Sequence, residues 1–149
     1  MGKHKKFEAA LIVIGNEILS GRTQDTNTMW IAERLNERGI ALREVRVIPD
    51  IEKTIIDAVN TLRTQFDYIF TTGGIGPTHD DITAESIAKA FDMTLEKNEE
   101  AFKMLEDHYG LTELTPARSK MSMIPKGARL IPNPVSAAPG FIIENVQVM

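Results

Sequence analysis

The sequence YIFTTGGIGPTHDDIT (residues 68–83) joins a short apolar run to a glycine-rich loop and then to a segment with helical spacing. A strand that is buried on both faces of a parallel sheet has this continuous apolar character, and the paired glycines end it. The run AALIVI (residues 9–14) is of the same kind and ends at Gly15. We therefore predict two buried parallel strands, each followed by a turn.

Helical patterns and further strands surround these two runs. Residues 42–48 alternate in a way that favours a strand nearer the sheet edge. Apolar residues three and four apart predict helices over residues 29–38, 51–66, 84–91 and 101–109, and the second of these has Ile51, Ile55, Val59, Leu62 and Phe66 on one stripe. Strands that alternate with helices form βαβ units with right-handed crossovers.

The chain becomes loop-rich after Gly110. Residues 116–123 are compatible with a short helix that Pro116 opens, and residues 128–131 with a strand. Residues 141–143 and 146–149 are predicted to form a β-hairpin around Glu144-Asn145. The predicted fold is a three-layer α/β/α domain with a mostly parallel sheet and a C-terminal β-hairpin, spanning residues 7–149 after a basic leader at residues 1–6.

Composition narrows the classes of function. The 149 residues carry 17 Lys plus Arg against 21 Asp plus Glu, a net charge of −4, so no basic surface for nucleic acid is expected. The absence of cysteine excludes disulfides and thiolate zinc sites, and is compatible with the cytoplasm, which is the expected location. No apolar run is long enough for a signal peptide or a membrane span.

Three segments follow predicted strands and are expected to meet at one edge of the sheet. They are residues 15–21, residues 49–50 and residues 73–81. Ligands of open α/β sheets bind beyond the carboxyl ends of the strands. Three glycines within residues 73–76 allow backbone N–H groups to approach an anion, most simply a phosphate. The loop lacks the Lys-Ser/Thr of a Walker A loop, and His79 replaces the last glycine of a dinucleotide fingerprint.

Carboxylates beside a phosphate site suggest a metal ion. Asp50, Asp80 and Asp81 would repel a phosphate unless a divalent cation such as Mg²⁺ bridged them, so these three are the predicted metal ligands. Asp is also a favoured helix N-cap, and by position alone Asp50 and Asp81 are predicted to cap the helices that follow. Capping and metal binding are compatible.

Two other side chains invite a functional reading. His79 has no partner at metal spacing and is interpreted as a loop residue. Trp30 lies among apolar neighbours, and is interpreted as a core or subunit contact rather than a ligand platform.

The motifs together resemble one family. TGGIGPTHDDIT (residues 72–83) is similar to the T-G-G-x-G-P-T-x-D-D-x-T signature of the molybdopterin-binding domain shared by MoaB, MogA and the N-terminal part of CinA. GNEILSG (residues 15–21) and DTN (residues 25–27) resemble segments of the CinA branch, where Asp25 replaces an Asn. NPVSAAPGF (residues 133–141) is similar to N-P-x-G-T-A-P-G-F, where Ser136 and Ala137 replace Gly-Thr.

The resemblance implies a domain that binds molybdopterin or a nucleotide through its phosphate. By motif position it implies catalytic and metal-binding roles for Asp50 and Asp81. The ligand-binding residues that it implies, together with the loop analysis, are Gly15, Asn16, Glu17, Gly73, Gly74, Gly76, Pro77, Thr78, Thr83, Ser136, Pro139 and Gly140.

Three functions stay open. The first is Mg-dependent hydrolysis of a dinucleotide pyrophosphate such as ADP-ribose, as in CinA-like proteins. The second is adenylylation of molybdopterin in molybdenum cofactor biosynthesis, as in MogA-like proteins. The third is non-catalytic binding. The resemblance also implies a homo-oligomer, a trimer or a dimer. Family members continue beyond the last strand into a Gly/Pro-rich loop and a helix, so we expect a domain cut short at its C-terminus.

Overall fold

The computed structural model describes residues 5–135 and 137–149. The strands are β1 (Phe7–Ile14), β2 (Ile40–Ile48), β3 (Tyr68–Thr72), β4 (Leu95–Lys97), β5 (Met123–Pro125), β6 (Arg129–Ile131), β7 (Gly140–Ile143) and β8 (Val146–Val148). The helices are α1 (Asn16–Leu19), α2 (Asn27–Glu37), α3 (Glu52–Leu62), α4 (Thr83–Ala90), α5 (Glu99–Tyr109), α6 (Pro116–Ser119) and the 3-10 helix η1 (Lys120–Ser122). Residues 1–4, most of the predicted leader, lie outside the described residues.

The main sheet has the strand order β2-β1-β3-β8-β7-β6. Strand β1 pairs in parallel with β2 and β3, and β3 pairs in parallel with β8. Strand β7 is antiparallel to both of its neighbours, β6 and β8. The sheet is therefore mostly parallel and carries the C-terminal hairpin, which confirms the predicted fold class.

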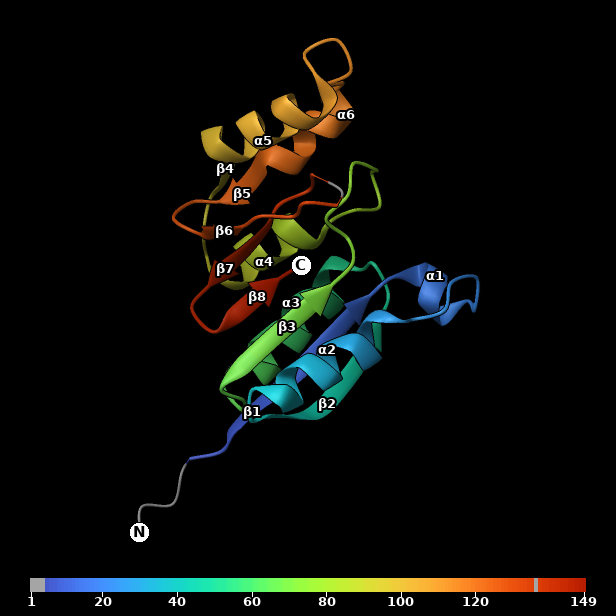
Figure 1. The fold of residues 1–149 in the computed structure, drawn as a ribbon, viewed down its shortest axis with the longest axis vertical. Coiled ribbons are helices and arrows are strands. Elements are labelled where there is room, and N and C mark those ends of the chain that lie inside the picture. The colour runs from blue at the N-terminus through green and yellow to red at the C-terminus, as the bar shows by residue number, and fades with distance from the viewer. Residues whose placement is uncertain (1–4, 136) are drawn as a thin grey trace.

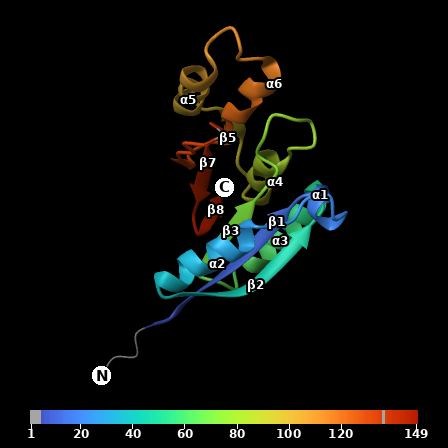
Figure 2. The same ribbon diagram turned by 45° about the vertical axis from the view of Figure 1, so that its right-hand side comes forward.

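The helices form layers on both faces of this sheet (Figure 1). Helices α3 and α4 pack together on one face, and α2 lies on the other. A lobe formed by α5, α6 and the short β4–β5 pair extends away from the sheet, as Figures 1 and 2 both show. The sequence did not predict β4 or β5, whose three-residue strands are too short to show an alternation.

Burial of β1 on both faces explains why its sequence is a continuous apolar run. Ala10, Ile12 and Ile14 point into the core under α3 and α4, whereas the residues between them face Ile31 and Leu35 of α2. Each side chain from position 9 to 14 is at most 3% exposed. Alternate side chains of a strand point to opposite faces, so burial on both faces requires apolar residues at every position.

Some predicted burial is wrong. Ile51 was placed on the α3 stripe, but it precedes the helix as its N-cap and is 53% exposed. Trp30 is 58% exposed, which excludes the core position, one of its two predicted roles, while the subunit contact stays a prediction. In the edge strand β2, Val45 and Val47 share a face and are 40% and 38% exposed.

Candidate functional site

The ends of β1 and β2 are joined directly at one edge of the sheet. The Gly15 amide donates to the Ile48 carbonyl at 3.0 Å. Beyond this bond, the Asn16 amide donates to Asp50 Oδ2 at 3.0 Å, and the Asp50 amide donates to Asn16 Oδ1 at 3.3 Å. This reciprocal pair fixes the Asp50 carboxylate relative to the first turn of α1.

The glycine loop after β3 joins the same edge through close backbone contacts. Gly73 has a φ of 93°, and a Cβ atom there would lie 2.0 Å from the Ile14 carbonyl oxygen. Gly74 has a φ of 74°, and its Cβ would lie 2.1 Å from Thr83 Oγ1 and 3.6 Å from Asp50 Oδ1. No other residue type fits such contacts at positive φ. The three predicted segments therefore converge, and we call this edge the rim.

Thr83 holds the glycine loop through two hydrogen bonds. It is fully buried, its hydroxyl donates to the Gly73 carbonyl at 2.9 Å, and its amide donates to the Gly74 carbonyl at 3.0 Å. Helix α4 begins at this residue, so the same side chain ties the glycine turn to the helix that follows.

Asp81 organises the outer part of the loop. One of its oxygens, Oδ2, accepts from the Thr78 amide and from the Thr78 hydroxyl, each at 2.8 Å. The same oxygen lies 2.8 Å from where a Cβ on Gly76 would stand, so Gly76 leaves room for the carboxylate. His79 and Asp80 lie at the exposed tip, where His79 Nε2 and Asp80 Oδ1 are 3.2 Å apart.

The predicted helix caps are wrong. The N-cap of α3 is Ile51 and that of α4 is Ile82, and neither helix has a side-chain cap hydrogen bond. Asp50 and Asp81 each lie one residue before the cap, and their oxygens accept from Asn16 and Thr78 instead. Both carboxylates therefore belong to the loops of the rim rather than to the helix ends.

Lys120 is a rim residue that the sequence did not identify. Its ammonium donates to the Thr78 carbonyl at 2.8 Å and to the Asp81 carbonyl at 2.7 Å. It also lines a crevice of about 20 Å³ together with Gly74, Gly76 and Asp81. Lys120 starts η1 in the other lobe, so no local motif connects it with the loop that it contacts.

The loop before β7 contributes one predicted residue to the crevice. Pro139 lines it, whereas Gly140 is buried where a Cβ would lie 2.3 Å from the Val148 carbonyl oxygen. The close passage of β8 therefore gives Gly140 a packing role. Ser136 lies outside the described residues. Glu17 and Pro77 stand at the rim, and a Cβ on Gly15 would meet the Glu17 carboxylate at 2.5 Å.

The carboxylates do not form a closed metal cage. Over residues 5–135 and 137–149, no group of three or more His, Asp or Glu side chains is arranged to hold a metal ion. Asp50 and Asp81 each use Oδ2 for a hydrogen bond to the protein. Mg²⁺ commonly binds through one or two carboxylates and completes its shell with water and phosphate oxygens, and these two residues fit that mode.

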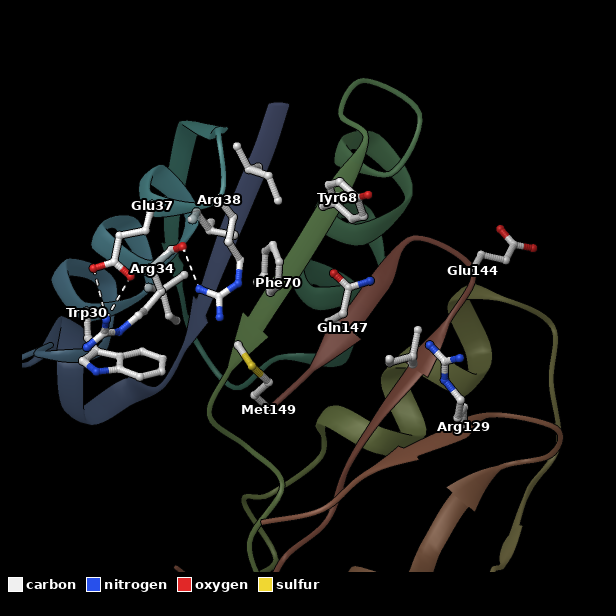
Figure 3. A pocket seen from close by; sticks show the side chains of 14 residues that line it. Trp30, Arg34, Glu37, Arg38, Tyr68, Phe70, Arg129, Glu144, Gln147 and Met149 are labelled. Atoms are coloured by element: carbon white, nitrogen blue, oxygen red, sulfur yellow. Dashed lines mark hydrogen bonds and ion pairs between the residues drawn. The ribbon is translucent and has the colours of Figure 1, made fainter. Parts of the chain in front are cut away.

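A larger groove lies elsewhere, on the face of the sheet beside α2 (Figure 3). Its volume is about 920 Å³, and Phe70, Gln147 and Met149 line its floor while Trp30 stands on its α2 side. Arg34 lies over the Trp30 ring at 5.4 Å and pairs with Glu37 at 2.9 Å. None of the predicted ligand or metal residues that the structure describes lines this groove, so its size does not make it the candidate site.

Comparisons with known proteins identify the family. Residues 10–149 match the model of the probable molybdopterin binding domain. The chain belongs to this molybdopterin-binding domain family. CinA from Thermoplasma acidophilum has the same fold with a TM-score of 0.89 at 38% identity, over 95% of this chain and 86% of that one. The CinA-like protein of Citrifermentans bemidjiense is 42% identical over 140 residues, 93% of this chain and 34% of its own length.

These matches confirm the resemblance of this molybdopterin-binding domain to the CinA branch. The fold is shared by the tungsten cofactor synthesizing protein MoaB from Pyrococcus furiosus, with a TM-score of 0.59 at 20% identity. The match covers 99% of this chain and 83% of that one. A protein of Pyrobaculum calidifontis is 41% identical over 138 residues, which are 91% of this chain and 53% of the relative. The chain thus spans about half the length of several curated relatives that it matches.

Within the described residues, no helix has the length and apolar character needed to cross a bilayer.

Proposed function

We propose that the rim binds the phosphate groups of a pterin or nucleotide, and that the reaction it serves is Mg-dependent hydrolysis of a dinucleotide pyrophosphate such as ADP-ribose. The observation that carries this proposal is the convergence of the Gly73–Gly74 turn with the carboxylates of Asp50 and Asp81. The turn supplies donors for an anion, and the carboxylates supply ligands for the cation that would accompany it.

Anion binding follows from the backbone of the loop. Gly74 and Gly76 carry no side chains that could cover their N–H groups, and α4 begins shortly after them with its positive dipole end. The crevice beside them, about 20 Å³, has room for one water-sized group. It therefore suits a single phosphate oxygen, while the rest of a pterin or dinucleotide would lie over the outside of the rim.

The two aspartates would hold Mg²⁺ through Oδ1, the carboxylate oxygen that the hydrogen bonds from Asn16 and Thr78 do not use. Asp81 lines the crevice proposed for the phosphate oxygen, and Asp50 Oδ1 lies 3.6 Å from where a Cβ on Gly74, another lining residue, would stand. A bound Mg²⁺ would supply charge neutralisation of the pyrophosphate and polarisation of its P–O bonds. Asn16 and Thr78 position the two carboxylates, and Thr83 keeps the glycine turn in place.

Hydrolysis is preferred over adenylyl transfer because of the level of similarity. CinA of Thermoplasma acidophilum and the CinA-like protein of Citrifermentans bemidjiense are 38% and 42% identical to this chain. The MoaB and Mog proteins of molybdopterin and tungsten cofactor synthesis are 16–20% identical, a level that supports a shared fold alone. The proposed hydrolysis adds one water across the P–O–P bridge of ADP-ribose, and releases AMP and ribose 5-phosphate.

A product assay tests the proposal. The protein is incubated with Mg²⁺ and ADP-ribose or FAD, and separately with ATP and molybdopterin, and AMP and adenylylated pterin are quantified. We expect AMP from the dinucleotides and its loss in D81N, because the amide cannot replace the carboxylate as a metal ligand. D107N, which alters an exposed aspartate paired with Lys103 on α5, is the matched control and should keep full activity.

Other products would contradict hydrolysis. Adenylylated pterin without AMP from the dinucleotides would indicate the transferase. Ligand binding without turnover in either mixture would indicate a binding domain. AMP release by D81N at the wild-type rate would exclude the metal role of Asp81.

A further inference from the structure

Lys120 connects the glycine loop to the lobe that contains α5 and α6. Its ammonium donates to two carbonyls of the loop, those of Thr78 and Asp81, at 2.8 and 2.7 Å. Thr78 also contacts the Asp81 carboxylate through its amide and hydroxyl. The lysine therefore holds both ends of a turn whose centre is the exposed His79-Asp80 tip.

Lys120 also carries the positive charge of the crevice. Eleven described residues line it. Among these, Lys120 is the one basic side chain. Lys120 is half-buried, and most of its neighbours here are apolar, so its charge is less screened than that of a fully exposed lysine.

The ammonium has donor capacity beyond the loop. A lysine has three N–H donors, and the hydrogen bonds described for Lys120 use two of them. The crevice that it lines has room for about one oxygen atom (about 20 Å³). A phosphate oxygen placed there would receive a charge-assisted hydrogen bond, the stronger kind for an anion.

We propose that Lys120 is a ligand-binding residue that reads the phosphate of the ligand and at the same time positions the glycine loop around it. The assignment rests on the proposed function, because it concerns the phosphate of that same ligand. It adds a basic residue from the α5–α6 lobe to a site built by the loops after β1, β2 and β3 and, through Pro139, by the loop before β7. Binding thereby depends on how this lobe is placed against the sheet.

The test uses inorganic pyrophosphate as the probe, titrated calorimetrically into the protein in the presence of Mg²⁺, which offsets the repulsion between the rim carboxylates and the anion. We expect K120M to raise the Kd for pyrophosphate at least about tenfold and K120R to recover most of the affinity, because arginine keeps the charge. The matched control is K126M, which removes an exposed lysine from the turn between β5 and β6. Hydrogen exchange over residues 78–82, measured on the same variants, reports the positioning role and should become faster in K120M.

The outcomes separate this assignment from the hydrolase proposal. A Kd for K120M within twofold of wild type, or no detectable binding of pyrophosphate by wild type, would overturn the phosphate contact. Unchanged hydrogen exchange in K120M would overturn the positioning role. If K120M does not fold, K120Q replaces it with the same expectation, because glutamine keeps donors and loses the charge. Lysine-dependent pyrophosphate binding without AMP release from ADP-ribose would support Lys120 and refute hydrolysis.

Discussion

Two buried threonines on either side of the glycine turn should respond oppositely to the same substitution. Thr83 and Thr71 are both fully buried. The Thr83 hydroxyl donates to the Gly73 carbonyl at 2.9 Å, whereas Thr71 Oγ1 has no hydrogen-bond partner among the described residues. Valine replaces the hydroxyl by a methyl group of similar size, so the pair isolates the hydrogen bond from the packing.

The size of the stability loss in Thr83→Val follows from the Gly73 carbonyl, which loses the donor described for it. Thr83→Val removes the described hydroxyl donor to a carbonyl inside the loop, which costs roughly 1–3 kcal/mol of unfolding free energy. For a domain of this size that lowers the Tm by roughly 2–4 °C per kcal/mol. Thr71→Val should be neutral or stabilising, because burying an unpaired hydroxyl already costs about 1–3 kcal/mol.

Thermal and urea unfolding followed by circular dichroism measure both variants. The expected order of unfolding free energy is T71V at or above wild type, and T83V clearly below it. Equal destabilisation of the two variants would refute the reasoning, since packing rather than the hydrogen bond would then dominate. Unchanged stability in T83V would show that the hydroxyl does not hold the loop.

Three further changes have defined outcomes. Gly74→Ala puts a Cβ 2.1 Å from Thr83 Oγ1 at positive φ, so it should abolish anion binding and lower the Tm. Calorimetry measures the binding and thermal unfolding measures the Tm. Unaltered binding would contradict the close contact at Gly74. The hydrogen bond from the Glu8 amide, and next the interaction with Lys5, lower the pKa of Asp67 below its ordinary value of 3.8. The ionised carboxylate therefore stabilises the fold above pH 3.8, and this stabilisation is lost as the pH falls further. D67N should therefore be less stable than wild type at pH 7, with a gap in urea midpoint that narrows below about pH 3.8; a constant gap would contradict this linkage. Glu144, at a φ of 49° in the β7–β8 turn, should gain stability on replacement by Asn, which tolerates that conformation better, by roughly 0.5–1 kcal/mol in urea unfolding; a loss would show that its Arg63 contact at 3.6 Å matters more.

The fold was predictable because its central strands are buried on both faces. Apolar runs such as residues 9–14 admit few other structures once glycines end them, and their parallel arrangement places the following loops at one edge. The meeting of Asn16, Asp50 and Gly74 at the rim follows from that topology. Local spacing and the strand order were sufficient for this part.

Individual side-chain hydrogen bonds between distant segments were not predictable, even where the topology brings the segments together. Lys120 bonds to Asp81 across 39 positions, and its neighbours Ser119 and Met121 form no motif that points to the glycine loop. The capping prediction was wrong for a related reason: spacing places an aspartate near a helix start, but Asp50 finds a partner 34 positions away, on α1. Short strands such as β4 depend on a partner strand that the local sequence does not reveal.

Location of the ligand is the central claim, and amide chemical shifts test it most directly. The ¹H–¹⁵N spectrum is assigned and titrated with ADP-ribose in the presence of Mg²⁺. We predict that the largest shift changes fall on Gly73, Gly74, Gly76 and Asn16, which belong to the loops of the rim. Shift changes confined to the groove beside α2, at Trp30, Phe70 and Met149, with the glycine loop unaffected, would contradict the account.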